Sequence, residues 1–220
     1  MADGVAMKER PILFTPENAQ KVFLGTKTQT RRIVKPQPPK WIDKYGQSLS
    51  PMHWIPSGVF ISDPSGMLGK GNLSIRQNGA SVKCPYGTIG DRLWVRESYY
   101  AESQSTIHYR GDFGGYEDDP KSGWKNAMFM PRWACRTVVE LTAVCVERLQ
   151  EISEDDAIAE GIEYCDGVGV GRAGYWQKDR SRICATAREA YRVLWESING
   201  PGSWALNPWV WVLEFKKVQS

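Results

Sequence analysis

The chain has 220 residues and an ordinary globular composition, with 41% hydrophobic residues, 24% charged residues and a net charge of +3, so one domain with a single core is expected. No apolar run reaches the roughly 18 residues that span a membrane, and the N-terminus lacks the apolar segment of a secretory signal. Five cysteines without a Cys-x-x-Cys pair favour reduced thiols and a cytoplasmic location, and they predict neither a metal site nor a cofactor.

The N-terminal segment predicts a strand followed at once by a helix. Pro11 to Phe14 is a short apolar run, which is typical of a buried strand. Thr15, Pro16 and Glu17 supply the capping hydroxyl, the proline and the acid of a helix start. Gly25 is expected to end this helix, because glycine readily adopts the left-handed backbone conformation that follows a last turn.

The segment from Gly25 to Arg32 is polar and basic, with one lysine, two arginines and three threonines. Between residues 18 and 42 the chain has no acid and six basic residues, namely Lys21, Lys27, Arg31, Arg32, Lys35 and Lys40. Hydroxyls beside cations suit an anionic or strongly polar ligand, and a basic stripe suits a phosphate-bearing partner. The same residues would also suit an exposed edge strand, because threonine favours strands and basic residues protect strand edges.

A strand is expected to begin within this motif. Thr28, Thr30 and Arg32 would share one face of it through the period-two alternation of strand side chains. Lys27 lies in the preceding turn, where alternation does not yet apply, so its side chain could point into the same cleft.

Further strands and helices are predicted downstream. Arg92 to Glu97 is predicted to be a strand, whose two faces carry Leu93, Val95 and Glu97 on one side and Arg92, Trp94 and Arg96 on the other. Residues 136–148, rich in Val and Thr, and residues 209–215 are also expected to be strands. One helix should start at Ser153 and end at Gly161, and a longer amphipathic helix should cover 187–198.

The order of these elements favours a single α+β domain over residues 1–220. Core segments at about 11–34, 88–100, 132–162 and 185–218 would be separated by three long loop insertions at about 35–87, 101–131 and 163–184. Several strands with short flanking helices suggest a small mixed β-barrel. A doubly wound sheet is disfavoured, because the helices are too few and too irregularly placed.

Three motifs resemble the ASCH domain family, a relative of the PUA fold. They are Gly25-x-Lys27-Thr28-x-Thr30-x-Arg32, Gly90-Asp91 at a strand start, and the closing strand Trp211 to Phe215. The whole chain is similar to the long, insertion-bearing ASCH proteins of tailed phages and prophages, especially over Cys84–Glu97 and Met130–Trp133. The resemblance implies a PUA-like barrel with a cleft for a nucleoside or RNA, and a monomer is expected.

A narrower resemblance is to short bacterial ASCH amidohydrolases, which remove the acyl group from N4-acetylcytidine. It implies that Lys27 is the catalytic lysine, Thr30 the nucleophile and Glu160 the catalytic glutamate. Without the resemblance, Glu160 would be interpreted as an ordinary acid on a helix surface. The three insertions leave open which N-acylated nucleobase or nucleoside is the substrate.

The chemistry of these residue types is consistent with that assignment. The Thr30 hydroxyl is a poor nucleophile unless a base takes its proton. Lys27 can act as that base if burial, or the charge of Arg31 or Arg32, lowers its pKa. Glu160 could pass a proton to the leaving amino group, and backbone amides or Arg96 could stabilise the oxyanion.

Eight further residues are predicted to bind the substrate: Thr28, Arg31, Arg32, Trp94, Arg96, Glu97, Arg132 and Trp133. A tryptophan beside an arginine can stack on a base and pair with a phosphate. Alternatively, Trp94 belongs to the core and Arg96 pairs with Glu97. Two other functions stay open, a non-catalytic ASCH module that binds RNA or a modified nucleotide, and a ribonuclease.

Overall fold

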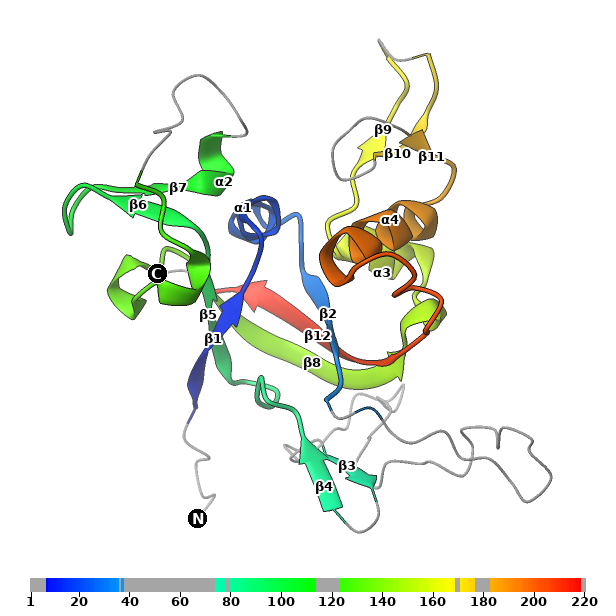
Figure 1. Ribbon diagram of the computed structural model, residues 1–220, viewed down its shortest axis with the longest axis horizontal. Helices are drawn as coiled ribbons and strands as arrows, with labels where there is room; N and C mark the ends of the chain where they lie inside the picture. Colours follow the sequence, from blue (N-terminus) through cyan, green and yellow to red (C-terminus); the bar gives the residue numbers. More distant parts are fainter. Residues whose placement is uncertain are drawn as a thin grey trace.

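A computed structural model of the protein describes residues 7–35, 37, 74–77, 80–113, 123–168, 171–176 and 183–218 (Figure 1). Its central element is a five-stranded sheet with the strand order β1-β5-β8-β12-β2. The strands are β1 (Glu9–Leu13), β2 (Gln29–Ile33), β5 (Arg92–Arg96), β8 (Val138–Arg148) and β12 (Trp209–Lys217). β1 and β5 run parallel, and the other neighbouring strands are antiparallel.

The helices in the described part of the chain are α1 (Pro16–Leu24), α2 (Arg110–Phe113), α3 (Glu154–Ala159) and α4 (Ala187–Asn199). Helix α1 begins and ends as predicted, because the Thr15 side chain accepts a hydrogen bond from the Asn18 amide and Gly25 has a φ of 80°. Ser153 and Thr186 cap α3 and α4 in the same way. Within the described ranges, no helix has the length and apolar character needed to cross a membrane.

Helices cover both faces of the sheet, as the alternation along β12 shows. Trp211, Leu213 and Phe215 belong to one apolar cluster with α1, whereas Val210 and Val212 belong to another cluster with α3 and α4. Because successive strand residues point to opposite faces, α1 packs on one face and α3 and α4 pack on the other. The side chains of β2 are therefore divided between two different surroundings.

Several small sheets lie in the predicted insertions. They are the hairpin β3 (Ser74–Gln77) and β4 (Ala80–Lys83), the hairpin β6 (Tyr99–Ala101) and β7 (Ile107–Tyr109), and the sheet of β9 (Tyr164–Cys165), β10 (Gly174–Trp176) and β11 (Ile183–Cys184). Three short 3-10 helices are Ala127–Phe129, Arg132–Ala134 and Leu149–Glu151. Most of the first insertion, residues 38–73, lies outside the described ranges.

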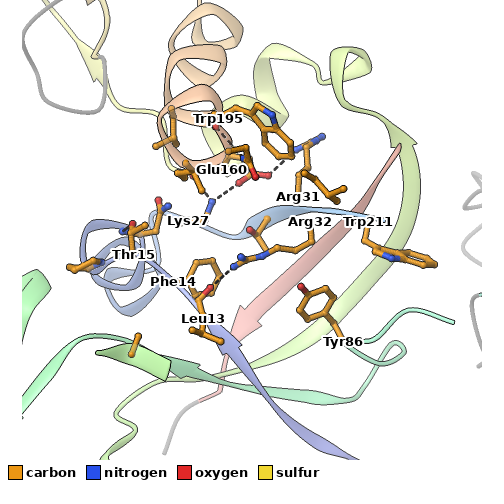
Figure 2. Close-up of a pocket in the computed structure, with 18 of the residues that line it drawn as sticks. Leu13, Phe14, Thr15, Lys27, Arg31, Arg32, Tyr86, Glu160, Trp195 and Trp211 are labelled. Atoms are coloured by element: carbon orange, nitrogen blue, oxygen red, sulfur yellow. Dashed lines mark hydrogen bonds and ion pairs between the residues drawn. The ribbon is translucent and has the colours of Figure 1, made fainter. Parts of the chain in front are cut away.

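The α+β class is confirmed, but the sheet is not closed into a barrel. β1 and β2 are its two edges and do not pair. A side chain joins them instead, since Arg32 Nη2 donates a hydrogen bond of 2.6 Å to the carbonyl oxygen of Leu13. The Phe14 ring stands beside this bond, with the Arg32 guanidinium 4.9 Å from its centroid (Figure 2). Side chains between the edges thus take the place of the backbone pairing that a closed barrel requires.

The turn before β5 is fixed by Asp91. Its carboxylate accepts hydrogen bonds from the amides of Lys8 (3.0 Å) and Thr88 (3.1 Å) and from Arg10 Nη1 (2.9 Å). Burial alone would raise the pKa of Asp91, but these hydrogen bonds and the Arg10 charge outweigh burial and lower it. The charged carboxylate therefore ties the start of β1 to the start of β5.

Asp91→Asn should lower the free energy of unfolding by about 1–3 kcal/mol at pH 7, because it weakens several hydrogen bonds to a buried charged group. A lowered pKa means that the unfolded chain binds more protons near pH 4. The contribution is therefore present above about pH 3.9 and is lost as the pH falls through the lowered pKa. Urea unfolding at several pH values measures this, with the exposed Asp155→Asn as a control that costs less than about 1 kcal/mol. An equal cost for both variants would contradict the prediction.

Candidate active site

A cavity of about 610 Å³ lies beside the edge strand β2, between the start of α1 and the helix α4 (Figure 2). Its lining includes Lys27, Thr30, Arg31, Arg32 and Glu160. The structure thus brings the three predicted catalytic residues, and two of the predicted substrate-binding residues, to one cavity.

Lys27 and Glu160 form a buried ion pair at this cavity. Lys27 Nζ lies 2.5 Å from Glu160 Oε2 and also donates a hydrogen bond of 2.7 Å to the backbone oxygen of Glu160. Their side chains are only 2% and 3% exposed. The pair joins the turn before β2 to the C-terminal end of α3, although the two residues are 133 positions apart.

Burial is the main reason that the pKa of Lys27 lies below the ordinary value of lysine, since it disfavours the ammonium form. Attraction to Glu160 and the hydrogen bond to it oppose this effect, and the nearby charges of Arg32 and Lys21 add to it. Of the two arginines expected to assist, Arg32 therefore contributes. Removing the proton of Lys27 therefore costs less free energy than it does for an exposed lysine.

Arg31 is surrounded by carboxylates and points away from solvent. Its guanidinium lies 2.6 Å from Glu147, 3.2 Å from Asp156 and 3.3 Å from Glu160, and it donates a hydrogen bond of 2.5 Å to Gln29 Oε1. The sequence around Arg31 contains no acid, but acids from β8 and from the α3 segment lie beside it in the fold and balance its charge. Its Nε and Nη1 donate hydrogen bonds to Glu147, Gln29 and Glu160, so these contacts stabilise the fold. The role of Arg31 in substrate binding stays a prediction.

Tyr191 is a site residue that the sequence did not identify as one, and it lies on α4, the predicted amphipathic helix. Its hydroxyl donates a hydrogen bond of 3.4 Å to Glu160 Oε1, the oxygen that also faces Arg31. Burial, followed by the charge of Glu160, raises the pKa of Tyr191 well above its ordinary value, so the phenol remains a donor. A tyrosine on the apolar face of a predicted helix could have indicated this contact, because a buried phenol hydroxyl needs a hydrogen-bond partner.

Thr30 is 4% exposed and lines the cavity from β2. Among the described residues, the hydrogen bonds of Lys27 Nζ go to Glu160 and none goes to the Thr30 hydroxyl.

Gly161 allows the end of α3 to approach Lys27, because its φ is 91° and a Cβ there would lie 3.0 Å from Lys21 Cδ and 3.3 Å from Lys27 Cβ. Helix α3 can therefore end directly against the lysine.

The other predicted substrate-binding residues lie outside the cavity lining. Thr28 is exposed at the start of β2, and the Arg96 guanidinium lies 5.4 Å from the Trp94 ring. Glu97 is fully buried and pairs with Arg136 at 2.9 Å, whereas a pair with Arg96 was the expected alternative. The two remaining residues lie on the surface, where Arg132 pairs with Glu9 and Trp133 is 52% exposed.

The described residues contain no group of three or more His, Cys, Asp or Glu side chains that could hold a metal ion. His108 lies 3.3 Å from Glu102 and outside the cavity lining, and His53 lies outside the described ranges.

Comparisons with protein-family models, with curated proteins and with solved structures find no match.

Arg31→Met should lower the free energy of unfolding by about 3–5 kcal/mol, because it leaves the partly buried Glu147 and Asp156 without their cation and removes one of the two cations of buried Glu160. Thermal or urea unfolding at pH 7 provides the measurement. Arg132→Met is the matched control, since it breaks an arginine–glutamate pair whose side chains are 48% and 38% exposed and should cost less than about 1 kcal/mol. Similar costs for the two variants would show that the Arg31 cluster does not stabilise the fold.

Glu160→Gln should lower the pKa of Lys27 further, because it removes the carboxylate that favours the ammonium form. NMR titration of the labelled lysine side chain gives this pKa directly. Tyr191→Phe is the control, because it removes one hydroxyl and keeps the carboxylate, so the pKa of Lys27 should move less. An unchanged or raised pKa in the glutamine variant would contradict the assignment of the pair.

Proposed function

We propose that the chain is an ASCH-type amidohydrolase with a PUA-like fold that acts on N4-acetylcytidine or a related N-acylated nucleobase or nucleoside. The observation that carries the proposal is the convergence of Lys27, Thr30 and Glu160 on one cavity. A chance match to the motif would not require the distant Glu160 to pair with Lys27. The side-chain bridge from Arg32 to Leu13, which links the two edges of the sheet, supports the PUA-like assignment.

In the proposed reaction, neutral Lys27 takes the proton of the Thr30 hydroxyl as Thr30 Oγ1 attacks the acyl carbon. The carbon–nitrogen bond then breaks, and the Lys27–Glu160 pair returns a proton to the N4 atom of the leaving cytosine. Water hydrolyses the acyl–threonine ester and restores the enzyme. The lowered pKa of Lys27 supports the first step, since the lysine must lose its proton before it can act as a base.

The cavity walls suit a flat heterocycle. Phe14, Tyr86 and Trp195 supply aromatic surfaces, while Asn18, Asn126 and Asn199 supply amide groups. Aromatic faces bind nucleobases by stacking, and a few polar groups fix their orientation. A volume of about 610 Å³ leaves room beyond the base itself.

The second candidate function is binding of RNA or a modified nucleotide without turnover. It is favoured by the hydrogen bonds of Lys27 to Glu160, because among the described residues the lysine is not bonded to the Thr30 hydroxyl. For catalysis, the lysine has to turn towards Thr30 when substrate enters. Catalytic hydrogen bonds often tighten only in the substrate complex.

Incubation of the purified protein with N4-acetylcytidine should release cytidine. Lys27→Met, Thr30→Val and Glu160→Gln should each lower kcat/KM by about 10²- to 10⁴-fold, because each removes a group that transfers a proton or attacks the acyl carbon. Thr28→Val is the matched control for Thr30→Val, since Thr28 is exposed and lies outside the cavity lining. Circular dichroism establishes that each variant is folded.

An inert wild-type protein would refute the hydrolase proposal. If that protein binds RNA with an affinity that falls steeply as salt is added, the binding function is favoured instead.

A further inference from the structure

The four basic residues of the cavity lining fall into two groups. Lys27 and Arg31 form ion pairs with Glu160, and Arg31 also pairs with Glu147 and Asp156. Arg32 and Lys35 form no ion pair with a carboxylate of any described residue. Among the described residues of the lining, Glu160 is the only acid, and its charge is already offset by Lys27 and Arg31. The cavity therefore has excess positive charge at Arg32.

The Arg32 side chain is held in place by contacts that leave its charge uncompensated. One donor, Nη2, bonds the Leu13 carbonyl oxygen at 2.6 Å, and the guanidinium stacks on Phe14 at 4.9 Å (Figure 2). Its Nε is buried and has no hydrogen-bond partner in the part of the chain that the structure describes. A guanidinium carries five N–H donors in a fork that matches an oxyanion. Because no described carboxylate balances its charge, the guanidinium favours an anion from outside the chain.

The strand geometry places this anion site close to the proposed reaction centre. Thr30 and Arg32 lie on the same face of β2, because they pair with Leu213 and Trp211 of one apolar cluster. Two residues along a strand are roughly 7 Å apart. A ligand that presents an acylated base to Thr30 can thus reach Arg32 with a group a few bonds away from the base.

We propose that Arg32 binds a phosphate group of the ligand, so that the chain acts on a phosphorylated cytidine, either a nucleotide or a residue within RNA, in preference to the free nucleoside. The identity of the base rests on the proposed function, whereas the anion site rests on Arg32 alone. Lys35, which follows β2 and lines the same cavity, supplies a second cation near this end. Arginine suits phosphate recognition because two of its N–H groups can bond two phosphate oxygens at once.

The test compares cytidine with cytidine 5′-monophosphate by isothermal titration calorimetry. The wild-type protein should bind the monophosphate about 10- to 100-fold more tightly, which is the effect of one charge-assisted hydrogen-bonded pair. Arg32→Gln should abolish this preference, so that the variant binds the monophosphate no more tightly than it binds cytidine. The preference should also decrease as salt is raised, since it depends on charge.

Arg148→Gln is a matched control for Arg32→Gln. Arg148 also bonds a backbone oxygen, that of Asn207 at 3.0 Å, and also lies over an aromatic ring, 4.5 Å from the Trp209 centroid. It lies outside the cavity lining, so its variant should keep the preference for the monophosphate. Any loss of preference confined to Arg32→Gln is therefore not a general effect of removing a stacked arginine.

A cytidine trinucleotide without a terminal phosphate distinguishes the two sources of the phosphate. Tight binding of the trinucleotide supports recognition of an RNA phosphodiester, whereas tight binding of the monophosphate alone supports a free nucleotide. Equal affinity of the wild-type protein for all three ligands, or no binding of any, overturns the proposal. So does an Arg32→Gln variant that retains the preference.

The hydrolysis assay separates this proposal from the proposed function. A protein that is inert towards N4-acetylcytidine but still prefers the monophosphate through Arg32 lacks the hydrolase activity and retains the anion site. If Arg32→Gln instead slows hydrolysis of N4-acetylcytidine without any phosphate preference in the wild type, Arg32 stabilises the oxyanion and the phosphate proposal is wrong.

Discussion

The buried contact between Glu160 and its two cations is the interaction on which the arrangement of the site depends. Glu160 accepts from Lys27 through one carboxylate oxygen and from Arg31 and Tyr191 through the other. Removing such charges from water costs several kcal/mol for each ion unless the partners are close and their remaining donors are satisfied. This requirement fixes the position of the turn before β2 relative to α3 and α4. The cavity therefore has a rigid wall where the charged groups lie.

The fold meets this requirement by bringing elements together at the edge of the sheet. β2 is an edge strand, so α1 on one face and α4 on the other can both reach past it. An interior strand would have a neighbour at that position, and no cavity could open beside it. The residues that bond Glu160 come from the turn before β2, from β2 itself and from α4, so the site depends on long-range packing.

Local elements were predictable because local signals determine them. Thr15 and Gly25 bound α1 through a cap and a left-handed glycine, and both act within a few residues of the helix. The alternation of β5 also separated Leu93, Val95 and Glu97, which are buried, from Arg92, Trp94 and Arg96, which are partly exposed. By contrast, the partners of Arg31 are acids more than 100 positions away, and a region without acids in sequence gave no indication of them. The partner of Glu97 is another long-range contact, because Arg136 is 39 positions from it. The open sheet could not be predicted for a similar reason. The contacts of Phe14 and Arg32 join two sheet edges that are distant in sequence, and neither strand alone indicates them.

The adjacent arginines of β2 show how one strand can serve stability and binding at the same time. Arg31 pairs with Val212, which faces α3 and α4, whereas Arg32 pairs with Trp211, which faces α1. A shift of one residue in the register would turn every side chain of β2 to the other face, so that Arg31 would face α1 and Arg32 would face α3 and α4. Thr30 would then turn to the face of α3 and α4 as well, away from the face where it now lies with Arg32. The antiparallel pairing of β2 with β12 therefore selects which guanidinium compensates buried acids and which one remains available to an anion.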